Sequence, residues 1–461
     1  MLAELTQNSQ GTFGNLGMYA SGIPTGMMVD SKGPRWGVAL GAVLFAAGYY
    51  PIAQAYEAGP GAYSVGTLCV FSFFSGAGSA SAFTAAIKAA ALNYPENRGT
   101  ATAFPLAAFG LSAFFFSVIS TVAFADNTYA FLLLLASGTV ALPVLSFPFL
   151  RVLQPIHVHK HEHQVLRRAS SDDPDRILHA PGTVSDETAE DYKDDSENAS
   201  LLSSGSRRPI VDKNHEPPHL DVRGFALLPH PEFWQLFSML GLLTGIGLMT
   251  INNIGNDAQA LWKHYDLSTD PKYIQGRQVM HVSILSLGSF SGRLISGIGS
   301  DFLVSKLNRS RFWCLFASAL IFCLAQLLAT TIENPKLLVL VSGSTGLAYG
   351  ILFGVYPSLV AHTFGVHGLS QNWGTMTLAP VISGNVFNIL YGKIYDSHSI
   401  KNTDGDFECL EGKSCYAAAY WVTLIGGFGG VALCLWSVWH ENAVHKRMEK
   451  EDKRSGQDRL A

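Results

Sequence analysis

The sequence GMMVDSKGPR, residues 26–35, has a counterpart in GIGSDFLVSKLNRSR, residues 297–311, and the two together indicate the architecture. Each stretch ends an apolar segment and has a glycine, three further residues and an aspartate, which is Asp30 or Asp301, followed by cations. The copies lie on either side of a polar segment, and such corresponding halves are typical of transporters built from repeats. The alternative is that glycine, aspartate and arginine merely favour helix ends.

The charged residues of the chain are concentrated in two places. Residues 151–229 hold 24 of the 66 charged residues and residues 440–461 hold 11, which leaves 31 for the other 360 residues. A soluble domain carries about a quarter charged residues, so the remainder has too little polar surface to face water. The net charge of −4 offers no basic field for phosphates. We therefore expect a multi-pass membrane protein that binds no nucleic acid.

Eleven apolar runs are long enough to span a bilayer, which takes about 20 residues. We expect five helices in an N-terminal bundle, residues 1–150, and six in a C-terminal bundle, residues 230–439. The composition of residues 151–229 predicts a disordered linker, and residues 440–461 form a tail. The expected spans are 11–29, 36–56, 65–88, 99–124, 129–150, 233–255, 279–300, 312–332, 337–361, 374–394 and 416–439.

The basic residues give an orientation. Lysine and arginine are concentrated in alternate connections, in the linker and in the tail. Because cytoplasmic loops carry such an excess, we expect the linker and the C-terminus to be cytoplasmic.

The motif residues resemble a known family. Gly26, Asp30, Gly33 and Arg35 look like the signature of the major facilitator superfamily between its second and third helices, and Asp301 with its cations looks like the echo of that signature. The resemblance implies an all-α fold of two helical bundles and transport of a small organic solute by alternating access. The chain has no recognisable catalytic constellation, so we also expect that it is not an enzyme.

Shorter motifs indicate a branch of this family. GNLG at 14–17, RGTA at 98–101 and NVFN at 385–388 resemble the nodulin-like and fungal monocarboxylate-transporter-homologue branches. One departure is Ser31, since the family often has a basic residue directly after the aspartate. The branch favours a monocarboxylate-like anion as substrate, with H⁺ as the candidate coupling ion.

The repeat also predicts a missing element. A full span precedes the glycine–aspartate span in the second half, whereas only ten residues precede it in the first half. We therefore expect a truncated product of a twelve-helix protein that lacks helix one. The rival is a genuine eleven-helix form, which need not transport.

Arg293 is the leading candidate for substrate binding. It lies within an apolar span with Ser289 one turn earlier, and polar residues in spans are functional candidates. A guanidinium can bind a carboxylate through two hydrogen bonds. An arginine also precedes the corresponding motif in monocarboxylate transporters. The alternative is that Arg293 pairs with helix-end carbonyls or another bundle residue.

Other polar residues within the spans are weaker candidates. His281 suits a proton carrier because its unperturbed pKa is near 6.5, although it could equally lie at the lumenal interface. Asn252, Asn253, Asn385 and Asn388 could line the substrate cavity or hydrogen-bond one helix to another. The charged helix ends predict a cytoplasmic gate. Its expected residues are Gly26, Asp30, Gly33, Arg35, Asp301 and Arg311.

Two further predictions concern the linker and one loop. Glu197, Leu201 and Leu202 match an acidic dileucine signal for a sorting adaptor, which favours the vacuolar membrane over the plasma membrane. Cys409 and Cys415 could form a disulfide in an oxidising lumen.

The sequence contains no pattern for a cofactor, a metal site or a phosphate-binding loop. Secondary-active transport is therefore the leading function. The alternative is a non-transporting membrane sensor or scaffold that displays the central cytoplasmic segment.

Overall fold

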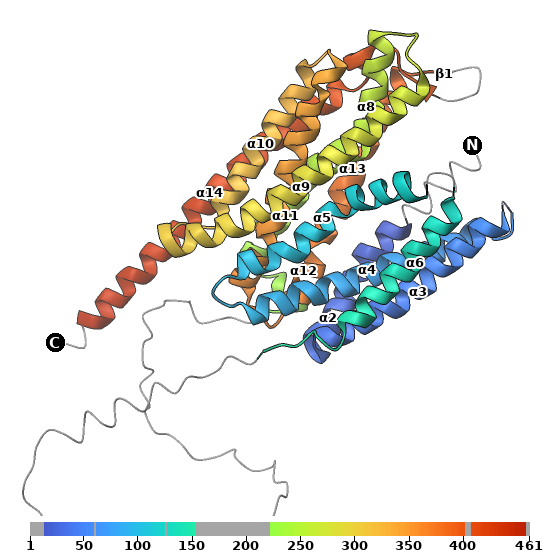
Figure 1. Ribbon diagram of the computed structural model, residues 1–461. Helices are drawn as coiled ribbons and strands as arrows, with labels where there is room; N and C mark the ends of the chain where they lie inside the picture. Colours follow the sequence, from blue (N-terminus) through green and yellow to red (C-terminus); the bar gives the residue numbers. More distant parts are fainter. Residues whose placement is uncertain (1–12, 60, 125–126, 154–221, 402–406, 458–461) are drawn as a thin grey trace, which may run out of the picture. The chain divides into compact units, whose positions relative to one another are not determined.

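A computed structural model describes residues 13–59, 61–124, 127–153, 222–401 and 407–457 (Figure 1). The described helices belong to one unit, formed by residues 1–153 and 219–461. The sorting signal expected at Glu197, Leu201 and Leu202 lies outside the described residues.

The first half begins with a helix that is interrupted near its middle. Residues 13–20 are helical, Ser21 forms a turn, and the helix resumes as α2. The backbone of Gly33 has a φ of 92°, which glycine adopts readily, and the following proline opens α3. The helices of this half are α2 (Gly22–Lys32), α3 (Pro34–Ala58), α4 (Val65–Asn93), α5 (Arg98–Ala123) and α6 (Thr128–Ser146).

The second half contains longer helices and a short hairpin. Strands β1 (Ile400–Lys401) and β2 (Phe407–Glu408) pair antiparallel, and the rest of the half is helices and connections. The α-helices are α8 (Pro231–Tyr265), α9 (Pro271–Leu307), α10 (Phe312–Thr331), α11 (Leu338–Phe364), α12 (Leu369–Met376), α13 (Leu378–Ser397) and α14 (Ala417–Gln457). The 3-10 helices are η1 (Gly224–Leu227), η2 (Pro335–Leu337) and η3 (Gly412–Cys415).

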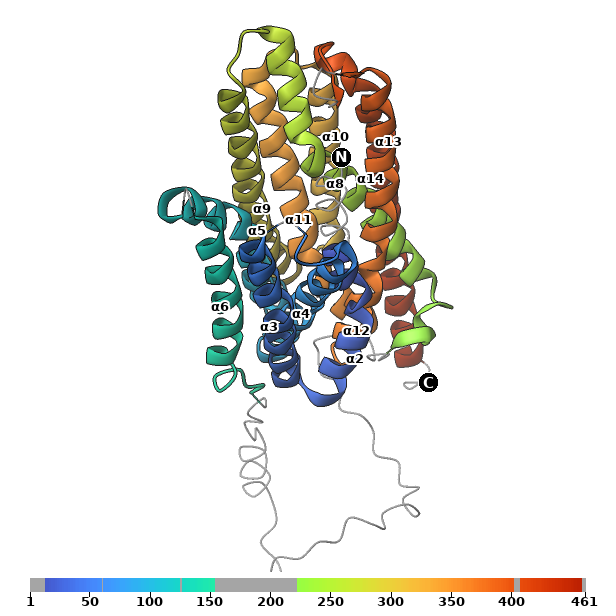
Figure 2. The ribbon, with the colours of Figure 1, turned by 90° about the vertical axis from the view of Figure 1, so that its right-hand side faces the viewer.

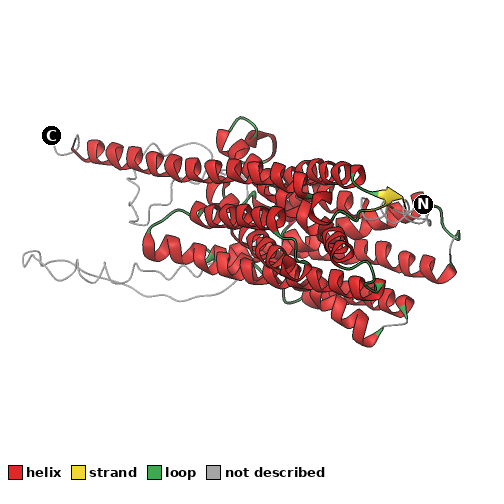
Figure 3. Ribbon diagram, turned by 90° about the horizontal axis from the view of Figure 1, so that it is seen from above, coloured by secondary structure: helices red, strands yellow, loops and turns green. Residues whose placement is uncertain are grey.

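The all-helical class expected from the sequence is confirmed, and Figure 3 shows helices along almost the whole described chain. Within the described residues, nine helices are long and apolar enough to span a membrane. The other two expected spans are each divided, at Ser21 and at Thr377. The count of eleven crossings therefore stays a prediction.

Small residues let the helices approach closely, as expected where apolar burial cannot drive association. A Cβ on Gly350 would lie 2.3 Å from the carbonyl oxygen of Ser289, so α11 and α9 pack backbone to backbone there. The two halves meet mainly along two helix pairs, α2 with α12 and α5 with α9, and also where α5 contacts α11 and α4 contacts α12 (Figures 1 and 2). These two pairs position the site.

Helix α8 runs beyond its predicted end. The expected span ends at residue 255, but α8 continues to Tyr265. The continuation is stabilised because Ala258 and Leu261 are buried against the other helices of the second half. Asp257 consequently lies inside a helix, with no exposed surface.

Candidate functional site

A small cavity lies between the two halves, beside Arg293. It has a volume of about 60 Å³, and ligand pockets typically have roughly 300–1,000 Å³. In this conformation it can hold a few water molecules but no organic solute. The residues that line it are Met18, Tyr19, Gly22, Ala80, Phe83, Thr84, Leu106, Phe109, Arg293, Tyr349, Phe353, Trp373, Gly374 and Thr377.

The guanidinium of Arg293 is the charged group of this cavity, and Arg293 is 3% exposed. Its Nη1 donates to the carbonyl oxygen of Leu106, on α5 of the other half. Its Cζ lies 5.4 Å from the ring centre of Phe109 and 5.7 Å from that of Phe353, which are cation–π distances. Its Nε has no hydrogen-bond partner, and no carboxylate pairs with Arg293 among the described residues.

Gly110 faces the same guanidinium and has no counterpart in the sequence expectations. A Cβ at this position would lie 3.2 Å from Nη1 of Arg293 and 3.1 Å from Oγ of Ser289. The absence of a side chain on α5 therefore leaves room for both predicted residues. Ser289 is buried beside Arg293 but does not line the cavity.

The four predicted asparagines lie elsewhere, since none of them lines the cavity of Arg293. The Nδ2 of Asn253 donates to Oδ1 of Asn388 at 2.9 Å, which joins α8 to α13. Asn252 and Asn385 are exposed, and Asn385 donates to the carbonyl oxygen of Val381 within its own helix. Their role in substrate binding stays a prediction.

His281 is fully buried between α9 and α11. Its Nδ1 lies 2.8 Å from Oγ of Ser342, and its Nε2 has no partner among the described residues. It does not line the cavity of Arg293.

Asp30 connects the two halves at one end of the bundle, which we call the gate end. It accepts hydrogen bonds from the backbone nitrogens of Ser370 at 3.2 Å and Gln371 at 2.8 Å, in the first turn of α12. It also pairs with Nζ of Lys88 at 2.9 Å. A carboxylate is stabilised there by the free N–H groups and the dipole of the helix.

Asp301 makes the corresponding contact from the second half. It accepts hydrogen bonds from the backbone nitrogens of Gly99 at 3.1 Å and Thr100 at 2.6 Å, in the first turn of α5. It pairs with Nη2 of Arg311 at 3.0 Å. Each motif aspartate thus binds the start of a helix in the opposite half, so the repeat seen in the sequence is a repeat of contacts.

The remaining predicted gate residues have different positions. A Cβ on Gly26 would lie 2.5 Å from the carbonyl oxygen of Ser370, so Gly26 permits close contact of α2 with α12. Arg35 is exposed, and its Nε donates to the carbonyl oxygen of Leu150 at 2.7 Å, within the first half. Gly33 shapes the turn between α2 and α3.

Lys88 makes contacts at the gate end that sequence reasoning missed. Besides pairing with Asp30, its Nζ donates to the carbonyl oxygens of Val366 and His367, both at 2.5 Å, across the two halves. In the sequence, Lys88 is a lysine at the end of an apolar segment. Such a lysine is explained equally well by the orientation of the chain in the membrane, so it does not by itself indicate a contact between the halves.

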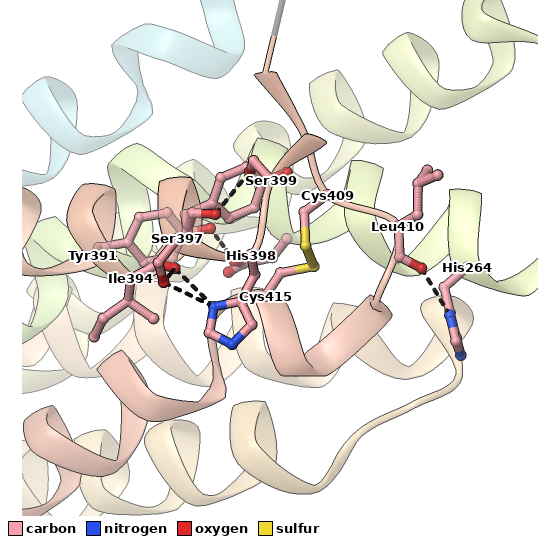
Figure 4. Close-up of a disulfide and its surroundings, with 11 residues drawn as sticks. His264, Tyr391, Ile394, Ser397, His398, Ser399, Cys409, Leu410 and Cys415 are labelled. Atoms are coloured by element: carbon pink, nitrogen blue, oxygen red, sulfur yellow. Dashed lines mark hydrogen bonds between the residues drawn. A yellow bond between two sulfur atoms is a disulfide. The ribbon is translucent and has the colours of Figure 1, made fainter. Parts of the chain in front are cut away.

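Cys409 and Cys415 are joined by a disulfide that closes the loop between α13 and α14 (Figure 4). Next to it, Nδ1 of His264 lies 3.0 Å from the carbonyl oxygen of Leu410. Glu408 forms an ion pair with Lys263. These contacts hold the loop on the end of α8.

Comparison with known proteins places these features in a family. The family model described as Major Facilitator Superfamily matches residues 3–387. The chain is 28% identical to the uncharacterized membrane protein YMR155W of Saccharomyces cerevisiae, over 88% of this chain and 83% of that protein. It is 24% identical to the probable transporter MCH1 of Gibberella zeae, over 93% of this chain and 82% of that protein.

A solved structure shares the fold. The crystal structure of the human organic anion transporter MFSD10 (TETRAN) aligns with a TM-score of 0.55 and 14% identity, over 92% of this chain and 82% of that one. The expectations of a membrane transporter, of this fold and of a chain that is not an enzyme are confirmed together. By the match over most of its length, the chain belongs to the Major Facilitator Superfamily of membrane transporters.

Proposed function

We propose that this transporter moves a small organic anion, with a monocarboxylate as the first candidate and H⁺ as the coupling ion. The observation that carries the proposal is the buried guanidinium of Arg293, which faces a cavity between the halves without a carboxylate partner among the described residues. A buried cation is costly unless it is paired, so the site favours an anion. A planar guanidinium suits a carboxylate because two N–H groups can bind its two oxygens.

The contacts that Arg293, Asp30 and Asp301 make between the halves support alternating access. In this conformation Nη1 is bonded to the carbonyl oxygen of Leu106, so the guanidinium that would bind the substrate also makes a contact between the halves. The cavity of about 60 Å³ must also widen to admit a solute. Because Asp30 and Asp301 hold the halves together at the gate end, the cavity would widen by separation of the halves away from that end.

Uptake into liposomes tests the substrate class. The purified protein is reconstituted and given labelled monocarboxylates, dicarboxylates, sugars and amino acids, with and without an inward proton gradient. We expect uptake of a carboxylate that Arg293→Ala lowers at least tenfold. Arg293→Lys keeps the charge without the planar pair of donors and should retain an intermediate rate.

Arg309→Ala is the matched control, because Arg309 is exposed and lies on the loop that follows the same helix. Uptake of a neutral solute that is equal in the wild type and Arg293→Ala would contradict the anion proposal. If no solute in the panel moves, the sensor or scaffold alternative gains.

We propose the vacuolar membrane as the location and the cytoplasm as the side of the C-terminus. The support is the dileucine sequence at Glu197, Leu201 and Leu202 and the distribution of basic residues. Fluorescence of a tagged chain that remains at the vacuole after Leu201→Ala with Leu202→Ala would contradict the sorting role.

A further inference from the structure

Asp257 of α8 is a buried carboxylate that the proposed anion site does not use. It is 0% exposed. One carboxylate oxygen accepts a hydrogen bond from the hydroxyl of Tyr391 on α13 at 2.6 Å, and the other accepts from the hydroxyl of Tyr420 on α14 at 2.5 Å. A carboxyl group therefore lies at the junction of three helices.

The partners of Asp257 differ in kind from those of the two gate aspartates. Asp30 and Asp301 each have a cation and two backbone N–H donors. Asp257 has neutral hydroxyl donors, and no cation pairs with it among the described residues. A carboxylate without a cation in a membrane span is costly, and such residues commonly mark proton pathways.

The groups packed around Asp257 leave its charge uncompensated. The titratable groups of α13, of α14 and of the residue between η3 and α14 that face it are tyrosines, namely Tyr391, Tyr395, Tyr420 and Tyr416. From α9, Gln278 donates to the carbonyl oxygen of Gly255 at 3.0 Å, and His281 contacts Ser342 of α11 instead. From α10, Gln326 bonds to Thr250.

These partners continue as a buried polar chain. Thr250 is within hydrogen-bonding reach of Tyr420. The Nε2 of Gln326 donates to Oγ1 of Thr250 at 3.2 Å, and Oε1 of Gln326 accepts from Thr423 at 2.6 Å. Hydroxyl groups both donate and accept, so they can reverse direction when the carboxyl group changes its protonation state.

We propose that Asp257 is a proton-binding site whose protonation changes the contact of α8 with α13 and α14. In the anionic form both tyrosines donate to the carboxylate. When one oxygen binds a proton it becomes a donor, so the tyrosine that faces it must turn its hydroxyl hydrogen away and accept, or lose the bond. One O–H bond to a proton from the solvent is formed, no other covalent bond changes, and one hydrogen bond to a tyrosine reverses or is lost.

The position of α13 links this site to transport, and this step rests on the proposed function. Tyr391 lies 14 residues beyond Thr377, which lines the cavity, and this corresponds to about 20 Å along a helix at 1.5 Å per residue. Helix α12 ends directly before Thr377, and a backbone N–H group of its first turn donates a hydrogen bond to Asp30. The helix pair α12 and α13 therefore contacts the gate, the cavity and Asp257.

Infrared spectroscopy tests the proton site without a known solute. Purified wild-type protein is titrated between acidic and alkaline buffer, and the carbonyl stretching band of protonated carboxylic acids is recorded. We expect a band that titrates, is lost in Asp257→Asn and is kept in Asp266→Asn, which removes an exposed carboxyl group at the end of the same helix. No titrating difference between the wild type and Asp257→Asn would overturn the proposal.

A second variant tests the same site independently, in case Asp257→Asn does not fold. Tyr391→Phe keeps the carboxyl group and removes one hydroxyl, so the band should remain and change frequency. An unchanged band would overturn the assignment.

Proteoliposomes then separate the proton site from the proposed function. With a carboxylate that is transported, Asp257→Asn should keep exchange of labelled for unlabelled solute and lose accumulation driven by a proton gradient. If no solute moves, the proposed function fails while the infrared titration still decides the site. Accumulation equal to the wild type would overturn the coupling.

Discussion

Arg293 is a residue that could be singled out from the sequence as a candidate, because a cation within an apolar span is costly. The structure adds its partners. The carbonyl oxygen of Leu106 and the space beside Gly110 both come from α5, which lies 183 or more residues earlier in the chain. A carbonyl group and a glycine carry no distinctive signal in one sequence, so their role could not be predicted.

Gly110 offers a test of this geometry. The added methyl group in Gly110→Ala would lie 3.2 Å from Nη1 of Arg293 and 3.1 Å from Oγ of Ser289, and must displace one of them. We expect solute uptake to fall severalfold, because a displaced guanidinium no longer meets the substrate correctly. Gly138→Ala is the matched control, since a Cβ at Gly138 meets no atom within 4 Å. Equal uptake in both variants, measured per mole of protein, would show that the position of Arg293 is unimportant.

At the scale of the element, the sequence predicted the long apolar helices better than their interruptions. Runs of apolar residues are sufficient to indicate a helix in a bilayer, because every backbone group is satisfied within it. The break at Thr377 and the extension of α8 past Asp257 depend on partners elsewhere in the fold. Asp257, for example, lies beyond the expected span at 233–255, and its burial depends on Tyr391 of α13 and Tyr420 of α14.

The pair formed by α2 and α12 depends on Gly26. In Gly26→Val the Cβ would lie 2.5 Å from the carbonyl oxygen of Ser370, which belongs to a backbone that cannot simply rotate away. We expect α2 to separate from α12 and Asp30 to lose its bonds to the first turn of α12. Spin labels at Ser31→Cys and His367→Cys, which are both exposed, would report a longer distance.

Gly66→Ala is the control for this pair, because the nearest atom to its Cβ is the Ser64 hydroxyl at 3.9 Å. An unchanged label distance in Gly26→Val would mean that the two helices are not held by close packing at this point.

At the scale of the whole molecule, the two motif aspartates act as a symmetric pair of contacts between the halves. Asp30 reaches from the first half to α12, and Asp301 reaches from the second half to α5. The sequence could predict that both motifs lie at one end, because their order and flanking charges agree. It could not predict that each binds backbone N–H groups of the opposite half, since these groups are present at the start of every helix.

The symmetry predicts how the two contacts combine. A hydrogen bond to a charged group contributes about 1.5–3 kcal/mol, so each of Asp30→Asn and Asp301→Asn should shift the equilibrium toward separated halves by roughly tenfold. The sites are distinct and share no partner among the described residues, so the two shifts should multiply in the double variant. Spin labels at Ser31→Cys and His367→Cys measure the populations of the closed and the separated state in each variant. A double variant no more open than the more open of the two single variants would mean that the two contacts do not act independently.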